Sequence, residues 1–438
     1  MFRTLPGFRA LYPEDCARRN FIFEKWRKTA ESFGFRQFDP PVLEQVELFT
    51  EKSGEEIKSQ LFEFSDKGGR AVSLRPEMTP SLARMVGEKA GAIRRPVKWF
   101  AIGENYRYER QQKGRLRAFY QFNADILGEE SVFADAEIIA LLIESLRAFG
   151  LTSDEFKLRL GDRKLWALFL KGAGIPEEGI VPALSAIDKV EKVSPEAFEE
   201  ILCAALGGGG AGASALAEKI RAFIGLADLG SIRAAFDGDS AASEEARGRL
   251  DEWDRLLGIL GAMGVGDFVK PDLGIVRGLA YYTGFVFEAF QTVGTGRALA
   301  GGGRYDNLVG KLGYQDMCAV GFGMGDVTVG DLLDLVGKGG SSERPPEAYF
   351  VMGCEEARTP ALEMVSRLRR AGIGAEYPFK LQAFGKQFKQ AAASGAKFAV
   401  VLGAEELAGG FVKVKNLRDS SEIKVERDAV EAFLKGEL

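Results

Sequence analysis

The stretch WFAIGENYRYERQQKGRLRAFYQFNADILG, residues 99–128, predicts the core of the fold. Two runs with strand-like alternation flank a short polar segment at 111–115, which is the pattern of an antiparallel hairpin. Side chains along a strand point alternately to its two faces. The polar side chains therefore gather on one face of the hairpin: Asn105, Arg107 and Glu109 from the first run, and Arg117, Gln121 and Asp125 from the second.

This polar face has two interpretations. A sheet face that carries arginines, a carboxylate and an amide is costly to bury unless it meets a polar ligand. The same face could equally lie in solvent, and the spacing alone favours neither interpretation. The choice depends on the rest of the chain.

Composition predicts a globular protein of two or three domains. Its 438 residues are many for a single core, and 46% of them are hydrophobic. No apolar run reaches the length of a membrane span, and the first residues lack the apolar region of a signal peptide. Four scattered cysteines have no metal or redox spacing. We therefore expect a cytoplasmic protein with free thiols and no membrane partner.

The chain contains no histidine, and its net charge is −5. Imidazole is thus excluded as a base, nucleophile or metal ligand, and we expect no metal site built from histidine and cysteine. Chemistry would have to use carboxylates, arginines, hydroxyls and amides, with or without Mg²⁺. The charge argues against a non-specific coat for nucleic acid, but it leaves room for a local basic patch.

The order of patterns predicts two domains. We expect an α+β domain over residues 1–336, a Gly- and Ser-rich linker at 337–346, and a small α/β domain over 347–438. The Ala- and Glu-rich region at about 170–262 is expected to be a helical insertion in the larger domain. Strand and helix alternate in the small domain, which favours a largely parallel sheet.

Local signals predict several elements of the larger domain. The expected elements are a helix at 14–33 ended by Gly34, a hairpin at 61–74, a helix at 134–149, strands at 273–290 and a loop at 301–306. Thr79 is well placed to cap a helix that begins at Pro80.

Four polar clusters recur in the larger domain: RPEMT at 75–79, the hairpin, VRGLAYYT at 276–283 and GGRYD at 302–306. Arg304 and Asp306 could bind a ligand or simply pair with each other. Tyr281 and Tyr282 are adjacent, so in a strand they would face opposite ways and one would pack in the core.

These clusters, in this order, resemble those of the histidyl-tRNA synthetases, a family of class II aminoacyl-tRNA synthetases. The hairpin resembles class II motif 2, and the segment ending at Pro41 resembles motif 1. RGLAYYTG and GGRYD resemble two signatures of the histidine enzymes, and the small domain resembles their anticodon-binding domain. The resemblance implies a catalytic antiparallel sheet flanked by helices and a homodimer. It also implies that ATP activates L-histidine for transfer to tRNA(His).

The resemblance further implies roles for individual residues. The residues expected to bind histidine are Glu77, Thr79, Arg107, Gln121, Asp125, Arg277, Tyr281 and Tyr282. The residues expected to bind ATP, which would carry Mg²⁺, are Arg107, Glu109 and Arg277, and the two arginines are the expected catalytic pair. The residues expected to meet the tRNA end are Arg110 and Gln112. Arginine suits such a site because its charged planar fork binds oxyanions bidentately.

The sequence departs from the family pattern at several positions. Thr328 stands where class II motif 3 usually has an arginine near the ATP tail, and Asp125 stands where many members have glutamate. One hypothesis is that Arg115 or Arg304 replaces the missing arginine.

Other functions remain open at this point. The main rival is the synthetase-like regulatory subunit of ATP phosphoribosyltransferase, which senses histidine without catalysis. Such relatives generally lack the anticodon-binding domain and lose catalytic arginines, whereas this chain has Arg107, Arg277 and a full second domain. A class II synthetase for another amino acid and an RNA-binding scaffold are the further alternatives.

Overall fold

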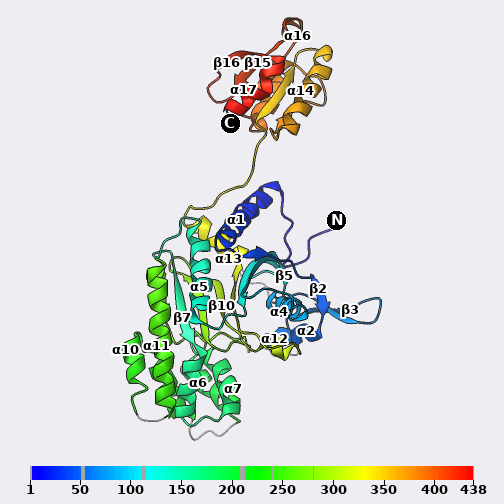
Figure 1. Cartoon of the computed structure of the whole chain (residues 1–438). Helices are drawn as coiled ribbons and strands as arrows, with labels where there is room; N and C mark the ends of the chain where they lie inside the picture. The colour runs from blue at the N-terminus through cyan, green and yellow to red at the C-terminus, as the bar shows by residue number, and fades with distance from the viewer. Residues whose placement is uncertain are drawn as a thin grey trace. The chain divides into compact units, whose positions relative to one another are not determined.

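The computed structural model describes residues 2–50, 55–109, 115–207, 213–238, 241–279 and 281–437. The chain forms two compact units, Met1–Ser341 and Ser342–Leu438 (Figure 1). Among the described residues, none of the helices combines the length and apolar character needed to cross a bilayer.

The first unit is built on an eight-stranded sheet. Its strands, in spatial order, are β1 (Arg36–Gln37), β5 (Val97–Tyr106), β6 (Ala118–Leu127), β11 (Ala319–Gly325), β10 (Ala298–Arg304), β9 (Phe285–Gln291), β7 (Phe156–Asp162) and β8 (Val269–Pro271). The six inner strands pair antiparallel, which confirms the predicted sheet, while β1 and β8 join the edges in parallel.

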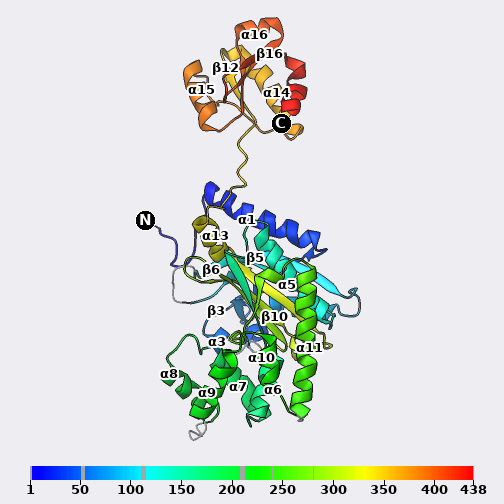
Figure 2. The same ribbon diagram turned by 90° about the vertical axis from the view of Figure 1, so that its left-hand side faces the viewer.

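One face of the sheet is covered by three helices, α1 (Pro13–Ser32), α5 (Val132–Arg147) and α13 (Asp326–Leu335) (Figures 1 and 2). The apolar stripe of α1 packs here, and the rings of Trp26 and Phe122 stack with centroids 5.5 Å apart. The helix ends where Gly34 takes a φ of +76°, a conformation that suits glycine. The apolar side of the hairpin therefore faces helices, and its polar side is left for a site.

The opposite face carries a small sheet and short helices. These elements are β2 (Leu43–Gln45), α2 (Glu47–Thr50), α3 (Glu55–Lys58), β3 (Phe62–Ser65), β4 (Ala71–Leu74), α4 (Thr79–Glu88) and α12 (Leu308–Lys311). The β3–β4 hairpin forms as predicted, because Asp66 accepts backbone hydrogen bonds from Gly68 and Arg70. The predicted cap at Thr79 is wrong by one position: Met78 caps α4, and Thr79 is its first residue.

The predicted helical insertion joins β7 to β8. It consists of α6 (Arg163–Gly172), α7 (Glu177–Ile187), α8 (Pro195–Ala205), α9 (Ala213–Ile224), α10 (Leu229–Ala234), α11 (Ala241–Ala262) and the 3₁₀ turn η2 (Gly266–Phe268). Figure 2 shows these helices gathered at one end of the unit. Buried aromatic side chains, among them Trp166, Phe198 and Phe223, join its core to the helical face of the sheet.

The second unit has a five-stranded mixed sheet. Its elements are β12 (Ala348–Met352), η3 (Glu355–Ala357), α14 (Arg358–Arg370), β13 (Ala375–Glu376), α15 (Phe384–Ala393), β14 (Phe398–Leu402), α16 (Ala404–Gly409), β15 (Phe411–Asn416), β16 (Glu422–Glu426), η4 (Arg427–Ala429) and α17 (Val430–Glu437). The expectation of a largely parallel sheet is half right. Strands β13, β12 and β14 are parallel, but β15 and β16 are antiparallel because the connection between them is too short for a crossover.

Two segments of the first unit differ from their predicted structure. Residues 272–279 and 281–284 form no regular strand, and β9 begins only at Phe285. The glycines at 301–303 were expected in a loop, but they belong to the central strand β10. Both differences concern segments that carry predicted site residues.

Candidate active site

Four glycines form a flat floor on the polar side of the sheet. Residues paired across antiparallel strands share a face, and Gly321 pairs with both Asp125 and Gly303, while Gly323 pairs with Gly301. A Cβ atom at Gly321 would lie 1.9 Å from Oδ1 of Asp125. The missing side chains therefore make room for polar groups from the neighbouring strands.

Asp125 lies on this floor and is 2% exposed. The Tyr305 hydroxyl donates a 2.6 Å hydrogen bond to its Oδ1, whereas its Oδ2 has no partner among the described residues. Burial raises the pKa of Asp125 to about 7, although the Tyr305 hydrogen bond lowers it and the charge of Glu77 adds a smaller increase. A buried acceptor that lacks a donor is expected to meet one in a ligand.

Gln121 lies on the same face of β6 as Asp125, four residues before it. Its Oε1 accepts a 2.9 Å hydrogen bond from Nδ2 of Asn105, which fixes the orientation of the amide. A Cβ atom at Gly323 would lie 2.3 Å from Nε2 of Gln121, so this glycine gives the amide nitrogen its space.

The segment after β4 brings a second carboxylate into the site. Glu77 is 5% exposed, and its Oε2 accepts a 2.9 Å hydrogen bond from the Tyr281 hydroxyl. The prediction that Tyr281 and Tyr282 face opposite ways is wrong, because they lie in an irregular segment. Both are buried with their ring centroids 5.1 Å apart. Thr79, at the start of α4, is also buried.

Arg277 reaches the glycine floor from an unusual backbone conformation with a φ of +58°. Its Nη1 lies 2.5 Å from Oε1 of Glu288, and its Nε is buried without a hydrogen-bond partner in the described parts of the chain. Burial alone would lower the pKa of Arg277, but the charge of Glu288 raises it above its ordinary value. The guanidinium therefore stays charged above Gly301.

Arg107 and Glu109 line a pocket of about 160 Å³ between the end of β5 and the start of α13. The other residues that line it are Arg115, Leu116, Phe119, Gly325, Asp326, Val327 and Thr328. Arg107 donates through Nε to the carbonyl of Pro76, 3.0 Å away, and its guanidinium carbon lies 5.3 Å from the Phe119 ring centroid. Gly325 of this pocket pairs with Gln121, whose amide lies over Gly323, so the pocket and the glycine floor are neighbouring parts of one site.

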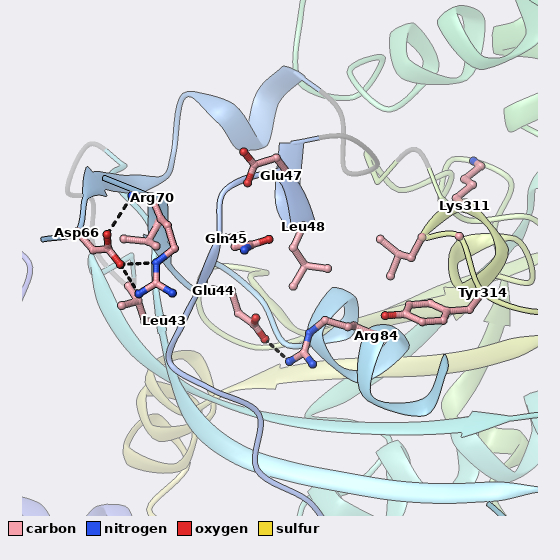
Figure 3. Close-up of a pocket in the computed structure, with 13 residues that line it drawn as sticks. Leu43, Glu44, Gln45, Glu47, Leu48, Asp66, Arg70, Arg84, Lys311 and Tyr314 are labelled. Atoms are coloured by element: carbon pink, nitrogen blue, oxygen red, sulfur yellow. Dashed lines mark hydrogen bonds and ion pairs between the residues drawn. The ribbon is translucent and has the colours of Figure 1, made fainter. Parts of the chain in front are cut away.

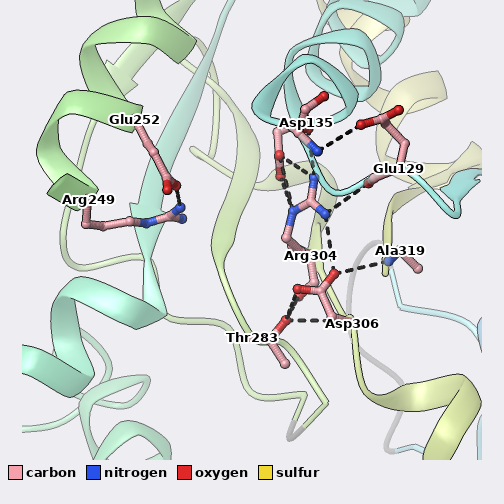
Figure 4. Close-up of polar contacts among 9 residues, drawn as sticks. Glu129, Asp135, Arg249, Glu252, Thr283, Arg304, Asp306 and Ala319 are labelled. Carbon is pink, nitrogen blue, oxygen red and sulfur yellow. Dashed lines mark hydrogen bonds and ion pairs between the residues drawn. The ribbon is translucent and has the colours of Figure 1, made fainter. Parts of the chain in front are cut away.

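The two candidates for the missing motif 3 arginine have different surroundings. Arg115 lines the pocket together with Thr328 and pairs with Glu109 at 3.2 Å. Arg304 is buried, with its Nη2 2.5 Å from Oδ2 of Asp135, and it also pairs with Asp306 (Figure 4). Its guanidinium already pairs with two carboxylates, which argues against Arg304 as a ligand for ATP.

A larger depression of about 750 Å³ lies elsewhere on the first unit (Figure 3). Its polar walls are held by ion pairs of Arg84 with Glu44 and of Arg70 with Asp66. None of the nominated residues that the structure describes lines this depression.

Two expected site residues lie outside the described residues, namely Arg110 and Gln112. Within the described ranges, no group of three histidine, cysteine or acidic side chains is arranged to hold a metal ion. Sequence reasoning missed Tyr305, Glu288 and the glycine floor. A usable signal for the floor was the alternate spacing of glycines at 301 and 303 and again at 321 and 323.

Comparisons with known proteins agree with these observations. The family model described as histidyl-tRNA synthetase matches residues 7–326, and that of an anticodon binding domain matches residues 347–437. The chain is 50% identical to the histidine–tRNA ligase of Opitutus terrae, over 99% of this chain and 98% of that protein.

Two solved structures share the fold. One is a histidyl-tRNA synthetase from Nostoc sp. PCC 7120, with a TM-score of 0.79 and 24% identity over 100% of both chains. Another, from Bacillus halodurans, is described as an ATP phosphoribosyltransferase regulatory subunit/histidyl-tRNA synthetase. It has a TM-score of 0.72 and 23% identity over 92% of this chain and 99% of that one. Fold alone therefore does not separate the two functions.

Proposed function

The chain belongs to the histidyl-tRNA synthetase family, and from this we propose that it is a histidine–tRNA ligase in which the glycine-floored site activates histidine. In the first step the carboxylate of L-histidine attacks the α-phosphorus of ATP, and the bond to the departing diphosphate breaks. In the second step the histidyl group passes from the adenylate to the 3′ end of tRNA(His). The first step removes no proton, so a site without histidine side chains suffices.

The observation that carries this proposal is the unsatisfied, buried Oδ2 of Asp125. It is an acceptor for an imidazole N–H, held in place by the hydrogen bond from Tyr305 to the other oxygen. A site built to hydrogen-bond its substrate rejects analogues that lack the donor by roughly 10⁴–10⁵. Tyr282, buried beside Tyr281, is proposed to complete the imidazole pocket.

Glu77, Thr79 and Gln121 are proposed to hold the rest of the amino acid. The carboxylate of Glu77 suits the α-ammonium group, and the amide nitrogen of Gln121 is turned away from Asn105 and available to the substrate. Because Glu77 and Asp125 are both buried acids, a substrate that brings a cation and an N–H donor would relieve the electrostatic cost of their proximity.

Arg107 and Arg277 are proposed to bind the α-phosphate and the substrate carboxylate. The reaction joins two anions and spreads charge over the phosphoryl oxygens, so fixed cations and alignment supply most of the catalysis. The ring of Phe119 beside Arg107 offers a surface for the adenine. Arg115 is proposed to neutralise the ATP tail in place of the arginine that Thr328 replaces.

Mg²⁺ bound with ATP fits the residues present. Proteins hold this ion through one or two carboxylates together with substrate phosphates. Glu109, one of two carboxylates that line the pocket with Arg107, would hold it. The ion would neutralise charge on the phosphates.

The two units are proposed to have different functions toward tRNA. Residues 1–336, with the insertion at about 170–262, would form the catalytic domain, and residues 347–438 would bind the anticodon beyond a linker at 337–346. Arg110 and Gln112, in the motif 2 loop, are proposed to meet the tRNA end. We further propose a cytoplasmic homodimer built through the motif 1 segment that ends at Pro41.

The regulatory-subunit alternative is less well supported. The chain retains Arg107 and Arg277, and its second unit matches the anticodon-binding model. Histidine-dependent exchange of diphosphate into ATP tests the choice. We expect exchange with histidine and charging of tRNA(His). Binding of histidine without exchange would favour the regulatory function, and exchange with another amino acid would redirect the specificity.

A further inference from the structure

Arg277 contacts an acidic residue to which no role in the reaction has yet been given. Glu288 projects from β9 onto the glycine floor, where it pairs with Gly301 of β10. Its Oε1 lies 2.5 Å from Nη1 of Arg277. The two side chains are 20% and 22% exposed, so the ion pair is largely shielded from water.

The absence of a side chain at Gly301 makes room for the guanidinium of Arg277 on the glycine floor. A Cβ atom there would lie 2.3 Å from Nη1, 2.5 Å from Cζ and 2.6 Å from Nη2 of Arg277. The arginine plane is thus held from below by glycine backbone and from one side by Glu288. Its backbone φ of +58°, a conformation rarely taken by residues other than glycine, brings the side chain to this place.

Glu288 engages Nη1 of the guanidinium, and the side chain of Tyr282 also interacts with Arg277. Nε is buried and has no hydrogen-bond partner among the described residues. Nε is therefore the N–H donor of Arg277 that is ready for an oxygen of a phosphate or carboxylate.

We propose that Glu288 is a positioning residue, which orients Arg277 so that its Nε faces the reacting phosphate. The inference rests on the proposed function, because it presumes that Arg277 binds the α-phosphate. Glu288 itself touches no substrate. Its loss should leave substrate affinity largely intact and lower the rate of adenylate formation, since a misplacement of about 1 Å can cost about 100-fold.

The test compares Glu288→Gln, Glu288→Asp, Arg277→Ala and the double variant Arg277→Ala/Glu288→Gln in histidine-dependent exchange, using the full chain. Glu137→Gln is the matched control. It breaks an ion pair with Lys98 of similar length, 2.6 Å, and similar exposure, 26%, on the helical side of the sheet. Thermal unfolding of every variant identifies any that fail to fold.

We expect Glu288→Gln to lower kcat by roughly 10–100-fold, with the KM values for histidine and ATP within about twofold of wild type. Glu288→Asp should restore part of the rate, and Glu137→Gln should match wild type. In the Arg277→Ala background the Glu288 change should have little further effect, because residues that act through one another are not additive.

Three results would overturn the inference. They are a folded Glu288→Gln with wild-type or higher kcat, a loss that appears equally in the Arg277→Ala background, and a rise in KM alone. If Arg277→Ala itself keeps the wild-type rate, the proposed role of Arg277 fails and the inference fails with it. An impaired Arg277→Ala beside an unimpaired Glu288→Gln refutes only the inference.

Discussion

Replacing Asp125 by asparagine tests how the site recognises its amino acid. The change keeps the size of the side chain and removes one acceptor oxygen. Because the Tyr305 hydroxyl donates to Oδ1 at 2.6 Å, the asparagine oxygen should remain toward Tyr305. The amide NH₂ would then occupy the place of Oδ2, where it meets an imidazole N–H donor to donor.

The expected loss follows from this geometry. A hydrogen bond to a charged group contributes about 1.5–3 kcal/mol, so Asp125→Asn should lower kcat/KM for histidine by roughly 10- to 150-fold. The KM for ATP should change by less than about twofold, because Asp125 is not among the residues that line the Arg107 pocket.

Diphosphate exchange at varied histidine and fixed ATP measures the effect, with circular dichroism to verify folding. A folded Asp125→Asn protein whose kcat/KM for histidine stays within about threefold of wild type would refute the reasoning. So would a loss that falls mainly on ATP.

Three other predictions concern the same part of the molecule. Since the folded-state pKa of Asp125 is raised from 3.8 to about 7, the carboxyl should destabilise the ligand-free protein progressively as pH rises between these values. Asp125→Asn should therefore raise Tm relative to wild type more at pH 8 than at pH 5, and a pH-independent difference would argue against this. Gly321→Ala, whose Cβ would lie 1.9 Å from Asp125, should lower kcat/KM for histidine by at least about tenfold, judged by exchange. Gly258→Ala in α11, where a Cβ meets nothing within 4 Å, is its control and should keep wild-type activity. Arg304→Ala should destabilise the fold by roughly 3–5 kcal/mol in urea titration, because it leaves Asp135 buried without its cation; a stable variant with only a raised KM for ATP would restore Arg304 as an ATP ligand.

The hairpin and its polar face could be predicted from sequence. Side chains alternate between the two faces of a strand every second residue, so a single strand is long enough to show the pattern. That pattern places Gln121 and Asp125 on one face and Phe122 and Ala124 on the other, and the register confirms it. Helix α1 was predictable for a similar reason, since its buried residues recur at helical spacing and Gly34 ends it.

The other features of the site could not be predicted, because they depend on contacts between residues that are distant in the sequence. The glycines of β10 suit a loop by composition, and only contacts with distant residues show that the missing side chain of Gly301 makes room for the Arg277 guanidinium. Arg304 pairs chiefly with Asp135, 169 residues away, rather than with its near neighbour Asp306 alone. Tyr281 and Tyr282 were expected in a strand because the irregular course of residues 281–284 leaves no clear signal in the local sequence pattern.

The most direct test of the account is amino-acid-dependent exchange of diphosphate into ATP by the wild-type chain, with each of the twenty amino acids supplied separately. We predict exchange with histidine, at a kcat/KM at least about 10⁴-fold above that for amino acids without an imidazole N–H. Absence of exchange with histidine, or equal exchange with another amino acid, would contradict it.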